Sequence, residues 1–289
     1  MNWKNLLILC WIMVIGSEGL EILKKRLPDA ILIGAKKSGT RALLTFISIH
    51  PNVSAANPEI HFFDKYYHLG IDWYRSQMPF ATQNQIVIEK TPKYLVDPKV
   101  AQRVYNMNKN VKLIVILRNP ISRAISEFVQ TQWKQKRNIF DVEEQARRFN
   151  RMLYQNRRGN LTIRKNWSVI RNGIYVKHVK NWLKYFPLES FIFINGDNLV
   201  RNPHQEMKKL QEFLAIKPII TERNFVMTTQ KRGFPCIRLK PGSDRIKCLN
   251  DQKGRPHPKI NPSVFQDLDQ FYKPFNKEFF ELIDQEPFW

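Results

Sequence analysis

The sequence predicts one α/β domain over residues 28–289, with a mainly parallel central sheet flanked by helices. Three observations predict it. Short β-branched runs alternate along the chain with longer segments of helical periodicity. Several of these runs are apolar at every position, which suits strands buried on both faces. No segment rich in proline, glycine and serine divides the body of the chain, so a second domain is not expected.

The expected elements follow from these patterns. Strands are expected at the short apolar runs, residues 30–34, 86–88, 111–117 and 191–194. Helices are expected where apolar residues recur with helical spacing, at residues 40–50, 98–107, 120–134, 173–185 and 203–214. The run from Val111 to Leu117 is the strongest strand signal. The tail from about residue 228 shows no such pattern and is expected to be irregular.

Composition excludes several classes of protein and points to a polyanionic partner. Of the 289 residues 43% are hydrophobic and 12% aromatic, which excludes a disordered chain, and 11 Gly with 17 Pro exclude a collagen-like array. The 47 Lys and Arg exceed the 25 Asp and Glu, giving a net charge of +22 spread along the chain. Such a field attracts nucleic acid, an anionic membrane, or a sulfated or carboxylated polysaccharide. A solvated basic surface without a specific partner is the alternative.

The first residues have the features of a targeting segment, which we place at residues 1–19 as a signal peptide or short signal anchor. The apolar run at residues 6–16 is eleven residues long, whereas a membrane-spanning helix needs about 20. Either form directs the rest of the chain into the secretory lumen. Glycosylation sequons begin at Asn52, Asn160 and Asn166, as expected for that route.

Cysteine usage fits the same compartment. In an oxidising lumen Cys236 and Cys248 are expected to form a disulfide. A zinc site is not expected from two cysteines without a nearby histidine pair. A luminal protein also rarely meets nucleic acid, so we expect no nucleic-acid partner, and a membrane contact only through an N-terminal anchor.

The segment at residues 31–44, ILIGAKKSGTRALL, combines a strand, a loop and a helix start. Backbone N–H groups at a helix N-terminus and the helix dipole bind anions, and Lys36, Lys37 and Arg41 add positive charge. In the phosphate-binding loop of nucleoside triphosphatases, a lysine and a magnesium-binding hydroxyl residue follow the second glycine. Here Gly39 is followed by Thr40 and the lysines come earlier. The loop therefore indicates a nucleotide phosphate held without a metal.

The segment from Pro58 to Asp64 groups an acid, a histidine and a second acid. In an extended segment Glu59 and His61 share one face, and Asp64 is placed to hold the imidazole in one tautomer. This grouping is typical of a general base with its supports. In isolation, a surface glutamate beside a structural histidine is the commoner explanation.

Further cationic residues stand where expected strands end. Lys90 follows the strand at 86–88, and ligands of open α/β sheets bind at such strand ends. Arg118 ends the strand at 111–117, and Ser126 on the next helix completes a second phosphate site. Residues 253–257 form a basic turn. Together these motifs predict two anion sites and one carboxylate around a single crevice.

Six spaced motifs resemble those of the heparan sulfate glucosamine 3-O-sulfotransferases: GAKKSGTRALL, EIHFFD, EKTP, LRNPISRAISEFVQ, NWSVIRNGIY and CLNDQKGRPHP. The resemblance covers residues 28–289. It implies a P-loop-nucleotide-kinase-like sulfotransferase fold and 3'-phosphoadenosine 5'-phosphosulfate as donor, with no metal required. It also implies heparan sulfate or heparin as the acceptor. A location in the Golgi lumen, anchored or secreted, follows from the leader.

The resemblance assigns roles to individual positions. Glu59 matches the catalytic base, with His61 and Asp64 in support, and the catalytic Lys37 and Lys90 would stabilise the charge that develops in the transfer, with Lys37 as the partner of the leaving oxygen. Donor-binding positions are matched by Lys37, Ser38, Gly39, Thr40, Arg41, Arg118, Ser126, Pro235, Lys253, Gly254, Arg255, Pro256 and His257. Acceptor-binding positions are matched by Lys36, Arg41, Glu59, His61, Asp64, Lys90, Gln130, Trp167 and Ser168. Cys236 and Cys248 match the disulfide of the family.

Three positions depart from the family pattern. Ser38 replaces a usual glycine, Asn119 replaces a usual acid beside Arg118, and Lys93 stands where a small residue is common. None removes a residue that the chemistry needs. Two other functions remain as alternatives, a carbohydrate sulfotransferase acting at another hydroxyl and a non-catalytic heparin-binding protein. Intact Glu59, Lys37 and Arg118 favour the enzyme.

Overall fold

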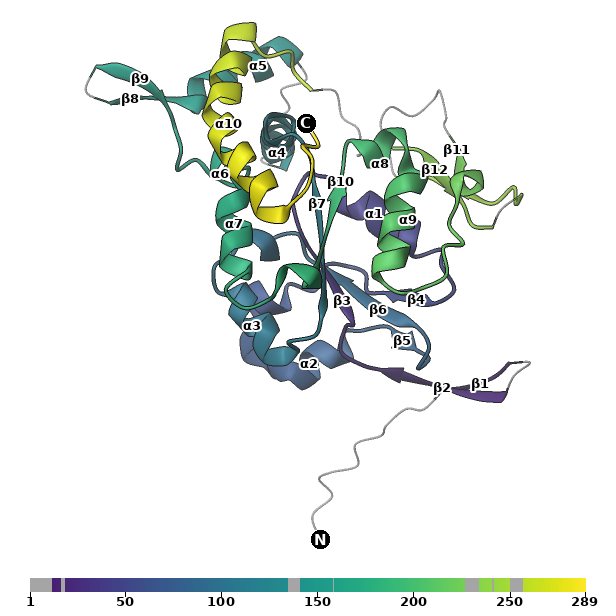
Figure 1. Ribbon diagram of the computed structural model, residues 1–289. Helices are drawn as coiled ribbons and strands as arrows, with labels where there is room; N and C mark the ends of the chain where they lie inside the picture. The colour runs from purple at the N-terminus through teal and green to yellow at the C-terminus, as the bar shows by residue number, and fades with distance from the viewer. Residues whose placement is uncertain are drawn as a thin grey trace.

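Five parallel strands form the central sheet of the computed structural model (Figure 1). The structure describes residues 12–16, 19–134, 141–157, 159–226, 234–240, 242–249 and 257–289. The strands are β3 (Ala30–Gly34), β4 (Val53–Ala55), β6 (Ile86–Lys90), β7 (Lys112–Leu117) and β10 (Phe191–Asn195). Their order across the sheet is β10-β7-β3-β6-β4. The parallel sheet predicted from the apolar runs is confirmed.

Strand β7 shows why fully apolar runs occupy the middle of the sheet. Successive side chains of a strand point to opposite faces. Leu113, Val115 and Leu117 therefore join the core on one face, whereas Ile114 and Ile116 join the core on the other. All five are at most 1% exposed. Burying each such side chain stabilises the fold by about 1.5–3 kcal/mol relative to leaving it in water.

Helices cover both faces of this sheet (Figure 1). One face packs against α1 (Thr40–Ile47) and α9 (Pro203–Phe213), with the short α8 (Asn198–Arg201) beside them. The other face packs against α3 (Val100–Met107), α4 (Pro120–Lys134), α7 (Tyr175–Trp182) and α10 (Pro262–Ile283). Shorter or outlying helices are α2 (Gly70–Ser76), α5 (Val142–Leu153) and α6 (Ser168–Arg171). The expected α/β layering is thus confirmed.

Three small antiparallel sheets lie outside the central one. The first contains β1 (Ile12–Gly16), β2 (Gly19–Lys25) and β5 (Phe80–Ala81), and the second is the hairpin of β8 (Tyr154–Arg157) and β9 (Asn160–Ile163). The third contains β11 (Phe225–Val226), β12 (Cys236–Arg238) and β13 (Ile246–Lys247), where a disulfide joins Cys236 to Cys248. Strand β1 lies within the segment expected to be a leader, whose residues 1–11 are outside the described part of the chain. None of the helices in the described ranges is long and apolar enough to cross a membrane.

The expectation of an irregular tail after residue 228 is wrong for helix α10, which runs for 22 residues. Its start carries a recognisable signal, because the Asn261 side chain accepts a hydrogen bond from the Ser263 N–H and Pro262 occupies the first turn. Pro274 lies inside the helix, and its helix-breaking character hides the periodicity from a sequence scan. The buried faces of Leu268 and Tyr272 hold the helix against the core.

A buried histidine on α7 predicts acid sensitivity of the fold. His178 is 8% exposed, and removal from water lowers its pKa to about 4. The unfolded chain therefore binds a proton more readily, so stability is lost as the pH falls from about 6.5 to about 4. The lowered pKa of His178 corresponds to a loss on the order of 3 kcal/mol in the free energy of unfolding over this pH range. Urea titrations at pH 7.5 and pH 4.5 give the free energy of unfolding at each pH. Between these two pH values it should fall less for His178→Gln than for the wild type. An equal loss in both proteins would contradict this assignment.

Candidate active site

A cleft of about 1160 Å³ opens where the five parallel strands end. Because the carboxyl ends of parallel strands meet at one edge, the segments that follow them are brought together there. Asp197 follows β10, Arg118 follows β7, the loop at residues 35–39 follows β3, Lys90 ends β6, and Glu59 follows β4. The sheet order therefore lays these groups out in one row across the cleft.

The loop between β3 and α1 lines the middle of the cleft and requires glycine at two close approaches. Gly39 has a left-handed backbone (φ 109°), and a Cβ there would lie 3.1 Å from the Phe234 ring. A Cβ on Gly196, just after β10, would lie 2.3 Å from the carbonyl oxygen of Ser38. The loop therefore packs directly on the backbone of residue 196. Sequence reasoning missed Gly196, although a glycine directly after a strand was a usable signal.

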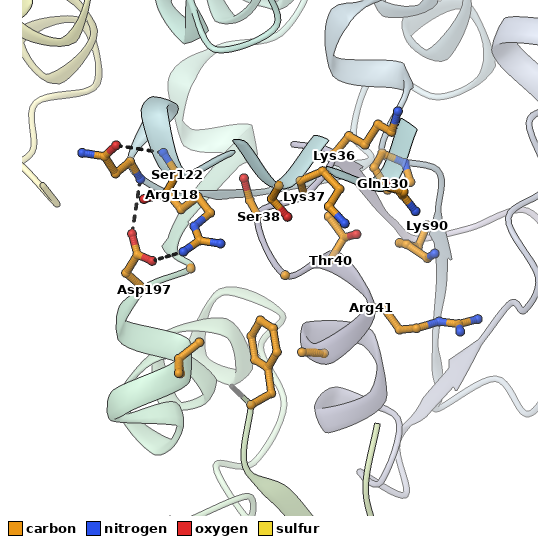
Figure 2. A pocket seen from close by; sticks show the side chains of 18 of the residues that line it. Lys36, Lys37, Ser38, Thr40, Arg41, Lys90, Arg118, Ser122, Gln130 and Asp197 are labelled. Carbon is orange, nitrogen blue, oxygen red and sulfur yellow. Dashed lines mark hydrogen bonds and ion pairs between the residues drawn. The ribbon is translucent and has the colours of Figure 1, made fainter. Parts of the chain in front are cut away.

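Arg118 stands at one end of the row (Figure 2). Its Nη2 lies 3.0 Å from Oδ1 of Asp197, while the other oxygen of Asp197 accepts the Asn119 N–H at 3.2 Å. The Asn119 side chain caps α4, because its Oδ1 accepts from the N–H groups of Ile121 and Ser122. Asparagine thus takes the capping role at a position where an acid was expected. Asp197 was missed in the sequence.

His257 enters the same cleft beside two cations. Although His257 is an exposed residue, the protein atoms around it and the charges of Arg118 and Lys37 lower its pKa to about 4. The imidazole is therefore neutral at neutral pH. It can exchange hydrogen bonds with a bound anion without adding a charge.

The opposite end of the row is a linked set of ionisable groups. Oε1 of Glu59 lies 2.5 Å from Nζ of Lys90, and Oε2 lies 3.5 Å from Nε2 of His61. The Nδ1 of His61 lies 3.0 Å from Oδ2 of Asp64. Glu59 remains 39% exposed, whereas Asp64 is 1% and Lys90 is 5% exposed. One accessible carboxylate is thus held by buried or half-buried partners.

The local backbone differs from the extended segment that the sequence suggested. His61 is left-handed (φ 57°), and residues Phe62–Tyr66 form a helical turn. This turn brings Asp64 back to the ring of His61. Phe62 stacks on Tyr74 with ring centroids 4.4 Å apart, and both are at most 1% exposed, which holds the turn against the core.

Lys36, at the same end of the cleft as Lys90, contacts a buried ion pair (Figure 2). Its Nζ lies 2.8 Å from Oε1 of Glu127, whose other oxygen lies 2.5 Å from Arg123. Burial pushes the pKa of Glu127 upward, but the charges of Arg123 and Lys36 outweigh it and hold that pKa below its ordinary value. Lys36 keeps 48% of its side chain exposed. Glu127 was not singled out from the sequence.

The structure brings most, but not all, of the predicted site residues together. The cleft is lined by the predicted residues Lys36, Lys37, Ser38, Gly39, Thr40, Arg41, Glu59, His61, Lys90, Arg118, Ser126, Gln130 and His257. Asp64 lies behind His61. Trp167, Ser168 and Pro235 are outside the lining; the Trp167 ring packs on Phe128 and Phe149. Residues 253–256 lie outside the described part of the chain.

The row has two cationic ends with a loop of backbone amides between them (Figure 2). Arg118 with Asp197 occupies one end, and Lys36, Lys90 and Arg41 occupy the other, with the loop between. Such an arrangement suits a ligand with two separate anionic groups and places a carboxylate base near one of them. Within the described ranges, no group of three or more His, Cys, Asp or Glu is placed to hold a metal ion.

Comparisons with known proteins bear on this site. A family model described as "Sulfotransferase domain" matches residues 27–281. Mouse heparan sulfate glucosamine 3-O-sulfotransferase 6 is 41% identical over 266 residues, covering 92% of this chain and 75% of the relative. Mouse heparan sulfate glucosamine 3-O-sulfotransferase 3A1 is 43% identical over 265 residues, covering 92% and 65%.

Among solved structures, a sulfotransferase from Alicyclobacillus acidocaldarius superposes with a TM-score of 0.61 at 21% identity. The match covers 90% of this chain and 97% of that protein. At that identity the likeness shows the fold alone.

Proposed function

The chain belongs to the sulfotransferase-domain family and, within it, to the heparan sulfate glucosamine 3-O-sulfotransferases, and from that premise we propose the reaction it catalyses. It transfers a sulfuryl group from 3'-phosphoadenosine 5'-phosphosulfate to the 3-hydroxyl of glucosamine residues in heparan sulfate. One observation carries the proposal. The accessible carboxylate of Glu59, paired with Lys90 at 2.5 Å, lines the same cleft as the anion-binding loop and Arg118.

The cleft fits the donor because the donor carries anionic groups at two places on one nucleotide. Arg118 and Ser126 would hold the 3'-phosphate at one end of the row. The backbone amides of residues 38–41 and the Lys37 ammonium would hold the 5'-phosphosulfate. Neutral His257 lines the cleft near Arg118 and Lys37 and offers a hydrogen bond. Bound there, the donor supplies an activated sulfuryl group.

Glu59 would act as the general base. Its carboxylate takes the proton of the 3-hydroxyl, and the oxygen that loses this proton attacks sulfur in line with the departing phosphate oxygen. Lys90 and His61 fix the orientation of the carboxylate, and Asp64 fixes the ring of His61. The Lys37 ammonium and the loop N–H groups are oriented before the reaction and stabilise the negative charge that develops in the transition state. Each of these hydrogen-bond donors contributes a few kcal/mol.

The acceptor end of the cleft is basic, as a polyanionic substrate requires. Lys36, Arg41, Lys65 and Lys93 line it together with Gln130. Heparan sulfate carries sulfate and carboxylate groups along its length, so several of these side chains can engage it at once. The net charge of +22 raises the local concentration of such a chain around the protein.

We also propose that the protein works as a glycoprotein of the Golgi lumen. Support comes from the disulfide between Cys236 and Cys248 and from the exposure of Asn52, Asn160 and Asn166. The apolar run at residues 6–16 is the proposed targeting signal. Treatment of the secreted or Golgi-retained protein with an N-glycosidase, followed by mass mapping of the three sequons, would test the modification.

Sulfate transfer is the decisive experiment. Purified full chain is incubated with donor labelled in the sulfuryl group and with heparan sulfate, and the product is digested and mapped by disaccharide. The expected result is donor-dependent label on the glucosamine 3-oxygen. Label at another hydroxyl would replace the assignment with a different carbohydrate sulfotransferase. Tight binding of heparan sulfate without transfer, in the presence of bound donor, would favour a non-catalytic heparin-binding protein.

A further inference from the structure

A second carboxylate, that of Glu89, is linked through Thr91 to the loop that carries the proposed base, and the proposed proton transfer does not use it. Glu89 precedes Lys90 at the end of β6 and is completely buried. Lys90 reaches up to Glu59, whereas Glu89 lies in the interior against Tyr74 and Thr91. A fully buried glutamate is rare unless its oxygens are satisfied by specific partners.

Every hydrogen-bonding partner of Glu89 is a donor. The Thr91 hydroxyl donates to Oε1 at 2.5 Å, and the Tyr74 hydroxyl donates to Oε2 at 3.4 Å. The backbone of Ile60 also interacts with this carboxylate and lowers its pKa. Burial raises the pKa of Glu89 to about 7, while these donors and the charge of Lys90 oppose the rise. The ionised form is therefore the one that these partners are arranged to hold.

The partners of Glu89 connect it to the loop that carries the base. Thr91 Oγ1, which donates to Glu89, also accepts the backbone N–H of His61 at 3.3 Å. The backbones of Ile60 and His61, the two residues that follow Glu59, thus both lead to one carboxylate. The buried hydroxyl of Tyr94 accepts the N–H of Phe63 at 3.4 Å and extends the same support along the loop.

The loop needs this support because its backbone is strained. His61 is held in the left-handed region (φ 57°), where a residue with a Cβ is disfavoured by about 1 kcal/mol or more. Without the bonds to residues 60 and 61 the loop would relax to a commoner conformation. The Glu59 carboxylate, which is 39% exposed, would move with it.

We propose that Glu89 is a positioning residue of the sulfuryl transfer, acting through Thr91 and the backbone of residues 60 and 61 to place the Glu59 carboxylate. The inference rests on the proposed function of Glu59. A general base must lie within hydrogen-bond reach of the proton it removes, so a small displacement lowers the rate steeply. Donor binding takes place elsewhere along the row, and its affinity should not depend on Glu89.

The sharpest variant is Thr91→Val, which keeps the side-chain shape and removes the hydroxyl that joins Glu89 to His61. We expect kcat, expressed per donor-binding site, to fall about 10- to 100-fold. The KM and Kd for donor should stay within about twofold of the wild type. Thr91→Ser restores the hydroxyl and should recover most of kcat. Glu89→Asp keeps the carboxylate but moves it away from the hydroxyls of Thr91 and Tyr74. This variant should lose kcat to about the same extent as Thr91→Val.

A matched control separates positioning from loss of stability. Gln211 is also completely buried and ties down a loop through the N–H and C=O of Ile220, but it lies outside the cleft. Gln211→Met should lower the unfolding midpoint without lowering kcat per donor-binding site. If Thr91→Val and Gln211→Met lower the midpoint equally and neither lowers kcat, Glu89 is only structural.

An activity-independent readout keeps this inference distinct from the proposed function. Hydrogen exchange of the peptide spanning residues 57–65 should accelerate in Thr91→Val and return toward wild type in Thr91→Ser. A wild-type protein that transfers no sulfate would overturn the role of Glu59, while accelerated exchange would still show the support of the loop. Active wild type together with unchanged kcat and unchanged exchange in Thr91→Val would overturn the positioning role.

Discussion

Glu59→Gln is expected to lower kcat about 1000-fold while leaving donor affinity unchanged. General-base catalysis contributes about 10²- to 10⁴-fold to a rate. Glutamine keeps the size of the side chain and an oxygen that can still accept from Lys90, at a site where the carboxylate oxygen now lies 2.5 Å away. It cannot take up the proton of the acceptor hydroxyl. The variant therefore removes the base and leaves the architecture in place.

The measurement is single-turnover and steady-state transfer of labelled sulfate, with donor affinity from calorimetry. A matched control is Glu278→Gln, which breaks another glutamate–lysine ion pair, with Lys180, on the protein surface. That variant should keep wild-type kcat. If Glu59→Gln retained kcat within about threefold, the proton would have to leave by another route and Glu59 would not be the base.

Arg118→Met is expected to weaken binding of 3'-phosphoadenosine 5'-phosphate about 100-fold. A hydrogen bond to a charged group contributes about 1.5–3 kcal/mol, which corresponds to roughly 10- to 150-fold in affinity. Arg118 also neutralises Asp197, whose Oδ1 lies 3.0 Å from the guanidinium. Removing the arginine leaves this carboxylate facing the 3'-phosphate, so repulsion adds to the lost attraction.

Two nucleotides distinguish the 3'-phosphate from the rest of the donor. Calorimetry with adenosine 5'-phosphosulfate, which lacks the 3'-phosphate, should show a loss of less than about fivefold for the same variant. Arg75→Met serves as the control, because it breaks the exposed ion pair between Arg75 and Asp72, which lies outside the cleft lining. This variant should bind both nucleotides with wild-type affinity. An equal loss for both nucleotides would place Arg118 at a different part of the donor.

The strands and most helices could be predicted because their signals are local. The run from Val111 to Leu117 is apolar on both faces, and in the structure both faces of β7 are buried. Helix α10 escaped because Pro274 interrupts its pattern, although Asn261 and Pro262 mark its start. Local signals are sufficient where one pattern dominates, and they fail where a breaker residue is tolerated by packing.

Site residues at strand ends could be predicted from the sequence, but contacts that depend on the order of strands in the sheet could not. Lys90 and Arg118 could be named because each stands at a strand end. Asp197 and Glu127 could not, because the cleft residues that they contact, Asn119 and Lys36, are 78 and 91 positions away in the chain. Such pairs depend on which strands and helices are neighbours, and no local pattern states this. The turn that returns Asp64 to His61 escaped for a related reason, since a left-handed histidine is rare.

The strand order β10-β7-β3-β6-β4 places two kinds of residue on opposite flanks of β3. Strand β7, on one flank of β3, leads to the proposed nucleotide-binding residue Arg118 and β10 leads to its partner Asp197, whereas β6 and β4, on the other flank, lead to Lys90 and the proposed base Glu59. Substitutions after β4 or β6 can therefore alter which sugar is sulfated while leaving recognition of the nucleotide intact. Recognition of the donor nucleotide and positioning of the acceptor hydroxyl thus depend largely on different strands of the sheet. New acceptor preferences can arise by change on a single flank, against a donor site that stays constant.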